Sequence, residues 1–494
     1  MAETQRMPDQ RPHRGPFAAA PALLLAAVLG GVLVTGRPAA AQPNVPPDFD
    51  PVALGLDPVP LLADALGLAF HPPAATAVST ARDRGRLTWI LTDRRAEPAW
   101  SIRIHGITSS LPDPSAGAEV DRYLRQLEGS RTRFRVISNE TVTCGSVAGR
   151  LCYLEQEVPG GGPVITGWLV LPSGPRTFVV FSIRTSPEHL PRLQDVLDAS
   201  FATISLRTAE ELAGLRQTRL EAGRALIESL TAPRLAPLVG LSQWFRIYRP
   251  GEGGTERELG YSRVEVVAAK KGTLNPRRRE REYDAGEHAM GLQIRVQGRI
   301  AIDPSRGVYY DSIALYWMAW DQSEEAWSIR GTHRQGKATH SESETGIRPP
   351  ASAGAPRPKL TVIKSSSASF SRDPYEWTIP EVYLSQALGW VIGHLLPKDG
   401  PQPREYGYYF YNYANAEPKV SLRVDRWAPA DDGTGNWVLT ARLSADSAPA
   451  RSVYRPDGRL LIRERDDGTV TVPIDRQQLR RLWQRKGLVL GGSR

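Results

Sequence analysis

The sequence is poor in the residues that build metal and redox centres. Its 494 residues include two cysteines and eight histidines, and the histidines are scattered without the paired spacing of zinc ligands. It also lacks a nucleophile elbow, an H-E-x-x-H pair, a phosphate-binding loop and a dinucleotide fingerprint. We therefore expect no cofactor and no bound metal, and the sequence leans away from an enzyme.

Long hydrophobic runs are absent except at the amino terminus. Residues 17–36 read FAAAPALLLAAVLGGVLVTG, three arginines precede them, and Ala39-Ala40-Ala41 follows directly before Gln42. This order is typical of a secretory signal peptide. We predict a signal peptide over residues 1–41, a periplasmic or secreted protein, and no membrane span after cleavage. The alternative is an uncleaved anchor, because 20 apolar residues can cross a bilayer.

The two cysteines agree with an exported protein. Cys144 and Cys152 lie in VTCGSVAGRLCYLEQE, a pattern that indicates a strand, a glycine-containing loop and a returning strand. In an oxidising compartment we expect them to form a disulfide, which in so short a loop stabilises the fold by about 2–3 kcal/mol. A redox or metal pair would need C-x-x-C or companion histidines.

The charge balance does not indicate nucleic-acid binding. The formal net charge is +9, which is mild for this length, and acids directly follow the densest basic run, NPRRRER at residues 275–281. With 44 glycines and 41 prolines the composition is that of a globular protein. At about 100–200 residues per domain, we expect two or three domains.

The first domain should be α+β. Residues 42–60 are a Pro-rich leader, and residues 61–206 alternate strand patterns with two helical patterns, near 118–127 and 187–199. This order predicts an antiparallel sheet with packed helices. The opening GLAFHPP, the segment TFVVFSIRTSPEHLPRLQDVLDASFATI and the closing Ser200-Phe201 resemble the PsbP/Mog1-like superfamily. The resemblance implies an accessory or assembly module without catalytic residues.

A helix should connect this domain to a second one. Thr208-Ala-Glu-Glu211 is a capping box, and residues 207–237 carry the linking helix. Residues 238–494 are rich in aromatic strands, and two similar series of strands indicate an internal repeat, with two antiparallel meanders in one curved sheet.

One helix should be buried inside that curve. Thr378-Ile-Pro-Glu381 indicates a second capping box, and the helix Tyr383–Leu396 is apolar nearly all round. A sheet wrapped on an apolar helix resembles the LolA-like lipoprotein carriers.

The segment YGYYFYNY at residues 406–413 is the most unusual in the chain. Strand alternation places Tyr409, Tyr411 and Tyr413 on one face, and with Trp390 of the apolar helix they are our candidate ligand-binding residues. Aromatic rings with polar tips suit a lipid, a glycan or an envelope protein partner. The simpler interpretation is that these rings pack in the core, because strands favour aromatics.

Two functions remain open from the sequence. The first is an exported, non-enzymatic binding or accessory protein of the cell envelope that holds a hydrophobic ligand. The second is a secreted hydrolase whose acids belong to three carboxylate pairs in turn-like contexts, Glu324-Glu325, Asp431-Asp432 and Asp466-Asp467. Turns collect such residues for backbone reasons alone, which favours the first function.

Overall fold

The computed structural model describes residues 49–491 except 84–85, 95–97, 131, 159–161, 337, 353–356, 368–373, 401, 415–416, 445–446, 448 and 466. The predicted signal peptide and most of the Pro-rich leader lie outside these residues. The chain divides between Glu221 and Ala222 into two compact units. We call residues 49–221 the N-terminal unit and residues 222–491 the C-terminal unit.

The N-terminal unit contains two antiparallel sheets and two packed helices. The seven-stranded sheet has the order β3 (Thr76–Asp83), β4 (Arg86–Asp93), β5 (Trp100–Thr108), β9 (Thr177–Thr185), β8 (Pro163–Pro172), β7 (Val147–Glu157) and β6 (Phe134–Cys144). The three-stranded sheet has the order β1 (Leu61–Ala63), β2 (Leu68–Phe70) and β10 (Ser205–Leu206). The helices are α2 (Ala116–Gly129) and α3 (Leu190–Ala202).

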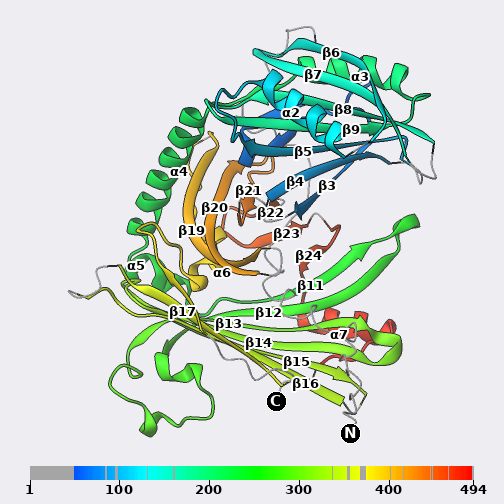
Figure 1. The fold of residues 1–494 in the computed structure, drawn as a ribbon. Coiled ribbons are helices and arrows are strands. Elements are labelled where there is room, and N and C mark those ends of the chain that lie inside the picture. Colours follow the sequence, from blue (N-terminus) through cyan, green and yellow to red (C-terminus); the bar gives the residue numbers. More distant parts are fainter. Residues whose placement is uncertain are drawn as a thin grey trace, which may run out of the picture. The chain divides into compact units, whose positions relative to one another are not determined.

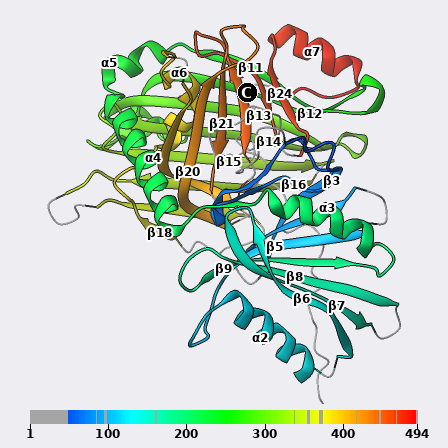
Figure 2. The ribbon, with the colours of Figure 1, turned by 90° about the horizontal axis from the view of Figure 1, so that it is seen from above.

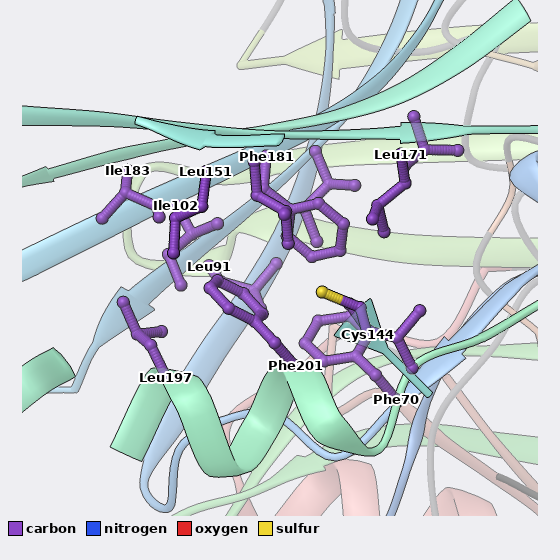
Figure 3. Close-up of a cluster of buried hydrophobic side chains, with 14 of the residues drawn as sticks. Phe70, Leu91, Ile102, Cys144, Leu151, Leu171, Phe181, Ile183, Leu197 and Phe201 are labelled. Atoms are coloured by element: carbon purple, nitrogen blue, oxygen red, sulfur yellow. The ribbon is translucent and has the colours of Figure 1, made fainter. Parts of the chain in front are cut away.

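The two helices cover opposite faces of the seven-stranded sheet. Successive side chains of β9 alternate between the faces, so Phe181 faces α3 while Val180 faces α2. On the α3 side, Leu197 and Phe201 pack with side chains from β2, β4, β5, β7 and β8 (Figure 3). Because both faces are covered, β9 is almost wholly apolar, as its sequence TFVVFSI indicates.

Helix α4 (Ala209–Ser229) follows, and its predicted capping box is present. The Thr208 amide donates to Glu211 Oε2 at 2.7 Å, and the Glu211 amide donates to Thr208 Oγ1 at 3.2 Å. The short helix α5 (Ala232–Leu235) comes next. No helix in the described ranges is both long enough and apolar enough to cross a membrane.

The C-terminal unit is built on one antiparallel sheet of 14 strands. The first meander runs through β11 (Ser242–Pro250), β12 (Glu256–Lys270), β13 (Met290–Asp303), β14 (Val308–Ala319), β15 (Glu325–Gln335), β16 (Ala338–Arg348), β17 (Lys359–Ser366) and β18 (Tyr375–Thr378). The second runs through β19 (Arg404–Ala414), β20 (Glu417–Pro429), β21 (Trp437–Arg442), β22 (Ala450–Tyr454), β23 (Leu460–Glu464) and β24 (Val470–Pro473).

The two meanders join where their strands β11 and β24 pair, with Phe245 opposite Pro473 and Tyr248 opposite Val470. The order therefore runs from β18 to β11, across to β24, and on to β19 (Figure 1). With its antiparallel sheets and few helices, the protein belongs to the α+β class, as predicted.

Helix α6 (Gln386–Leu395) lies against both meanders. It contacts β13 and β14 of the first meander, while Gly389 and Gly393 lie against the rings of Phe410 in β19 and Tyr454 in β22. A sheet that touches one helix from both of its halves must curve around that helix. Eight of the ten residues of α6 are buried, so the helix forms part of the core of this unit.

The predicted start of this helix is wrong. The cap is Ser385, whose Oγ accepts a hydrogen bond from the Leu388 amide at 3.3 Å. The preceding residues are extended because they pair with β19: the Tyr409 amide donates to the Val382 carbonyl, and the Leu384 amide donates to the Tyr409 carbonyl. This pairing with a distant strand overrides the local capping-box signal at Thr378.

The sequence analysis missed helix α7 (Arg476–Arg485) near the carboxyl end. Its cap is Asp475, whose Oδ1 accepts from the Gln477 amide at 2.7 Å, and its residues Leu479 and Trp483 are fully buried. The Trp483 ring meets the Tyr261 ring edge-on at 5.0 Å, which fixes α7 on β12 (Figure 2). The cap and the i, i+4 spacing of these apolar residues were the available signals.

Candidate functional site

A cavity lies between α6 and the part of the sheet where the two meanders join. Its volume is about 60 Å³, room for about four to six water-sized groups. Helix α6 supplies one wall with Trp390, Gly393 and His394. The predicted binding residue Trp390 is therefore at the cavity, where it also lies against Tyr316 of β14, with ring centroids 5.9 Å apart.

The rest of the lining is divided between apolar and polar side chains. The apolar ones are Leu241, Phe245, Val264, Val266, Val391 and Leu460. The polar ones are Ser242, Gln243, Ser262, Tyr454, Arg463 and Thr471. The strand residues come from β11, β12 and β22 to β24. Those of β12, Ser262, Val264 and Val266, are alternate residues and so lie on one face of the sheet.

Two of the polar side chains, Ser262 and Arg463, differ in their hydrogen-bond partners. Ser262 is 4% exposed, and its Oγ is buried without a hydrogen-bond partner in the described part of the chain. The guanidinium of Arg463 donates from Nε to Ser452 Oγ at 3.0 Å and from Nη2 to Tyr454 Oη at 3.5 Å. Strand neighbours thus hold Arg463 at the cavity, whereas the Ser262 hydroxyl has hydrogen-bonding capacity left.

His394 is the other titratable group on the α6 wall. Burial lowers the pKa of its imidazole, and the nearby ammonium of Lys398 lowers it further, while Asp457 acts in the opposite direction. The ring is therefore neutral at neutral pH. The only full charge among the lining residues at that pH is the guanidinium of Arg463.

The predicted tyrosine row does not line this cavity. Tyr411 is 3% exposed, and its ring packs between Trp327 at 5.3 Å and Trp377 at 5.6 Å. Tyr409 is partly buried, and its backbone carries the pairing with residues 382–384. The side chain of Tyr413 lies outside the described part of the structure. Tyr411 is thus a core residue, in line with the simpler interpretation of this segment.

The carboxylates of the hydrolase hypothesis belong to different strand connections: Glu324 and Glu325 lie where β15 begins, and Asp432 and Asp467 lie in two other turns. Glu325 is 1% exposed, and its Oε2 accepts a hydrogen bond from the Gln386 amide at 2.9 Å, at the start of α6. Glu324 forms an ion pair with Lys271. Asp432 and Asp467 each accept from the backbone two residues on, which is a turn motif. Asp466 is outside the described residues.

The predicted disulfide is wrong for this fold. Both Cys144 and Cys152 are buried free thiols. The strands β6 and β7 pair up to the turn, so Cys144 is opposite Val147 while Cys152 is opposite Asn139, five positions away. Five strand residues span about 17 Å, whereas the Cα atoms of a disulfide lie about 5.5–6 Å apart.

The two thiols also belong to different cores. Cys144 lies in the cluster beneath α3 (Figure 3), and Cys152 in the cluster beneath α2. Burial, followed by the charge of Asp198, raises the pKa of the Cys144 thiol to about 12. A thiol with so high a pKa is protonated and unreactive at neutral pH.

A polar cluster on the inner face of β14 to β16 was also missed by the sequence analysis. Tyr310 Oη donates to Glu342 Oε1 at 2.6 Å, and the rings of Tyr310 and His333 are 4.8 Å apart. Next to it, Trp327 Nε1 donates to the buried carboxylate of Glu344 at 2.9 Å, and burial raises the pKa of that carboxylate. Among the described residues, no three His, Cys, Asp or Glu side chains converge as metal ligands.

Comparison with known proteins adds a weak likeness in fold. No protein-family model and no curated protein matches the chain. The solution structure of cyanobacterial PsbP (CyanoP) from Synechocystis sp. PCC 6803 is 12% identical with a TM-score of 0.25, and the match covers 31% of this chain and 93% of that one.

A protein of unknown function from Pseudomonas aeruginosa, PA94, is 16% identical with a TM-score of 0.22 and coverages of 27% and 99%. These matches support the predicted resemblance to PsbP only as a weak likeness of fold.

Proposed function

We propose that this chain is an exported, non-enzymatic binding protein of the cell envelope, and that it holds a small ligand with an apolar body in the cavity beside α6. The observation that carries the proposal is the cavity itself, with Trp390 on one wall and apolar strand residues such as Phe245 and Val264 on the others. Pockets of this kind combine an apolar lining with a few placed polar groups.

The size of the cavity limits the ligand. About 60 Å³ suits a molecule of a few heavy atoms, or the end of a longer apolar chain, and not a whole lipid. The sheet around α6 is the arrangement expected of LolA-like carriers, and we place the N-terminal unit with the PsbP/Mog1-like accessory modules. Binding is favoured over hydrolysis because the turn carboxylates cap turns and the start of α6, or form an ion pair.

Export is the second part of the proposal. It rests on the order of charged, apolar and small residues at the amino terminus. Cell fractionation and amino-terminal sequencing of the purified protein test it: we expect an extracytoplasmic protein that begins at Gln42. A cytosolic protein with an intact first segment would contradict export without affecting the cavity.

Binding is tested with a small neutral probe. We expect butan-1-ol to bind in ligand-observed NMR and to lose binding when Val264→Phe fills the cavity. The matched control is Ile313→Phe on the outer face of β14, where Ile313 is 48% exposed. Native mass spectrometry of protein from its own host should show a small co-purified molecule. Binding of no four-carbon probe, or binding unaffected by Val264→Phe in a folded variant, would overturn the proposal.

A further inference from the structure

We propose that the β18 edge of the 14-stranded sheet carries a second binding site, an aromatic platform of Tyr375 and Trp377 on which a neutral glycan stacks. This site is separate from the α6 cavity, because neither residue lines that cavity. Three features of the edge support a glycan: the orientation of the two rings, the core contacts that hold them, and the charges beside them.

The two rings belong to the last strand of the sheet. Tyr375 and Trp377 are two positions apart in β18, so both project from the same face. Their ring planes are within 8° of parallel, and the ring centroids are 6.0 Å apart. Among the described strands only β17 pairs with β18, which leaves the other edge of β18 without a strand neighbour. Tyr375 is 43% exposed, so at least one ring of the pair is available to a ligand.

The core fixes the platform before any ligand binds. The Trp377 ring packs against the ring of Tyr411 with centroids 5.6 Å apart, and Tyr411 packs against Trp327 at 5.3 Å. Trp327 Nε1 donates to Glu344 at 2.9 Å, and the Tyr411 hydroxyl is hydrogen-bonded to the same carboxylate. A surface that is already ordered loses little conformational freedom on binding, which favours affinity.

The charges beside the platform disfavour an anion. Val362 of β17 is opposite Tyr375, and Lys364 lies two positions further along β17 on the same face. The Lys364 ammonium interacts electrostatically with the carboxylates of Glu344 and Glu342. These carboxylates balance the ammonium, so no net positive charge attracts a phosphate chain. The same polar side chains interrupt the continuous apolar area that would mark a lipid-binding surface.

A pyranose ring has the chemistry that this platform lacks a partner for. Its C–H groups carry partial positive charge and pack on the negative face of an aromatic ring, while its hydroxyls stay in contact with water and polar side chains. Tyrosine and tryptophan combine such a face with a polar group. A chain of linked pyranose rings can contact both Tyr375 and Trp377, so we expect an oligosaccharide to bind more tightly than a single sugar.

The test uses two neutral chains, cellohexaose and the hexamer of N-acetylglucosamine, in saturation-transfer NMR titrations at pH 7.5. At least one of them should bind, and glucose and the anionic hexagalacturonate should bind about fivefold more weakly or less. If neither neutral chain binds, or if hexagalacturonate binds as tightly as they do, the inference is overturned. Neither result affects the proposed function of the α6 cavity, which is tested separately with butan-1-ol.

Variants assign the binding to the platform. Tyr375→Ala should weaken the bound hexasaccharide by about five- to tenfold through loss of one stacked ring, whereas Tyr375→Phe, which keeps the ring, should retain most of the affinity. The matched control is Ile363→Ala, because Ile363 is 40% exposed on the opposite face of β17. If Tyr375→Ala and Ile363→Ala change glycan binding equally in folded proteins, the glycan does not stack on Tyr375 and the assignment is wrong.

Discussion

Substitution of Gly393 by alanine should loosen α6 from the sheet. A Cβ atom at this position would lie 2.0 Å from Cε1 and 2.4 Å from Cδ1 of the Tyr454 ring. Neither the ring nor the helix can move freely, because Tyr454 is 5% exposed and Val391 and Ile392 of α6 are also buried. The added methyl group must therefore displace packed atoms.

The size of the effect follows from two opposing contributions. Alanine is preferred over glycine in a helix by about 1 kcal/mol. An extra methyl group in a packed core costs about 1–3 kcal/mol, and an overlap this close belongs at the upper end. We therefore expect Gly393→Ala to lower the free energy of unfolding by about 2 kcal/mol. Because Gly393 lines the cavity, binding of butan-1-ol should fall as well.

The matched control is Gly214 on α4, where an added Cβ meets nothing within 4 Å. There the helix preference acts alone, and Gly214→Ala should stabilise the protein by up to about 1 kcal/mol. Urea unfolding followed by circular dichroism gives the overall stability. Hydrogen exchange of peptides from α6 and α3 assigns the change to a unit, since a two-unit chain need not unfold in one step. If both substitutions stabilise, the contact of Gly393 with Tyr454 is not tight and the argument fails.

Three further predictions concern buried groups. Asp425→Asn should destabilise the C-terminal unit by about 3–5 kcal/mol in urea unfolding, because it leaves the guanidinium of Arg423 buried without its countercharge. The control, Glu376→Gln in an exposed ion pair, should cost less than about 1 kcal/mol. Similar costs for the two variants would contradict this prediction. Without reductant, Ellman's reagent should detect two thiols in the denatured protein and none in the native protein, because both thiols are free and buried. Detection of no thiols after denaturation would show that the two cysteines form a disulfide. The pKa of His394 is lowered in the folded state, so the unfolded chain takes up the proton first and the free energy of unfolding should fall as the pH drops below about 6.5. His394→Gln should reduce this loss between pH 7 and 5. If the free energy of unfolding depends on pH equally in both proteins, His394 does not contribute.

The local sequence was sufficient for much of the fold. The capping box at Thr208, the apolar run of β9 and the apolar character of residues 386–395 depend on neighbours within a few positions, and each predicted its element. The α+β class and the burial of one helix followed from the same patterns, because periodicity reports which side of an element faces a core.

Long-range contacts decided the rest. Pairing with β19 kept residues 382–384 extended and moved the start of α6 to Ser385. The register of β6 and β7 separated Cys144 from Cys152, and the packing of Tyr411 against Trp327 and Trp377 placed it in the core.

The cavity could not be read from the sequence, because its walls come from residues as far apart in the chain as Leu241 and Thr471, which line one cavity only because β11 pairs with β24. A sequence specifies which face of a strand is buried. Which strands become neighbours, and therefore which side chains share a cavity, depends on the free energy of the whole sheet.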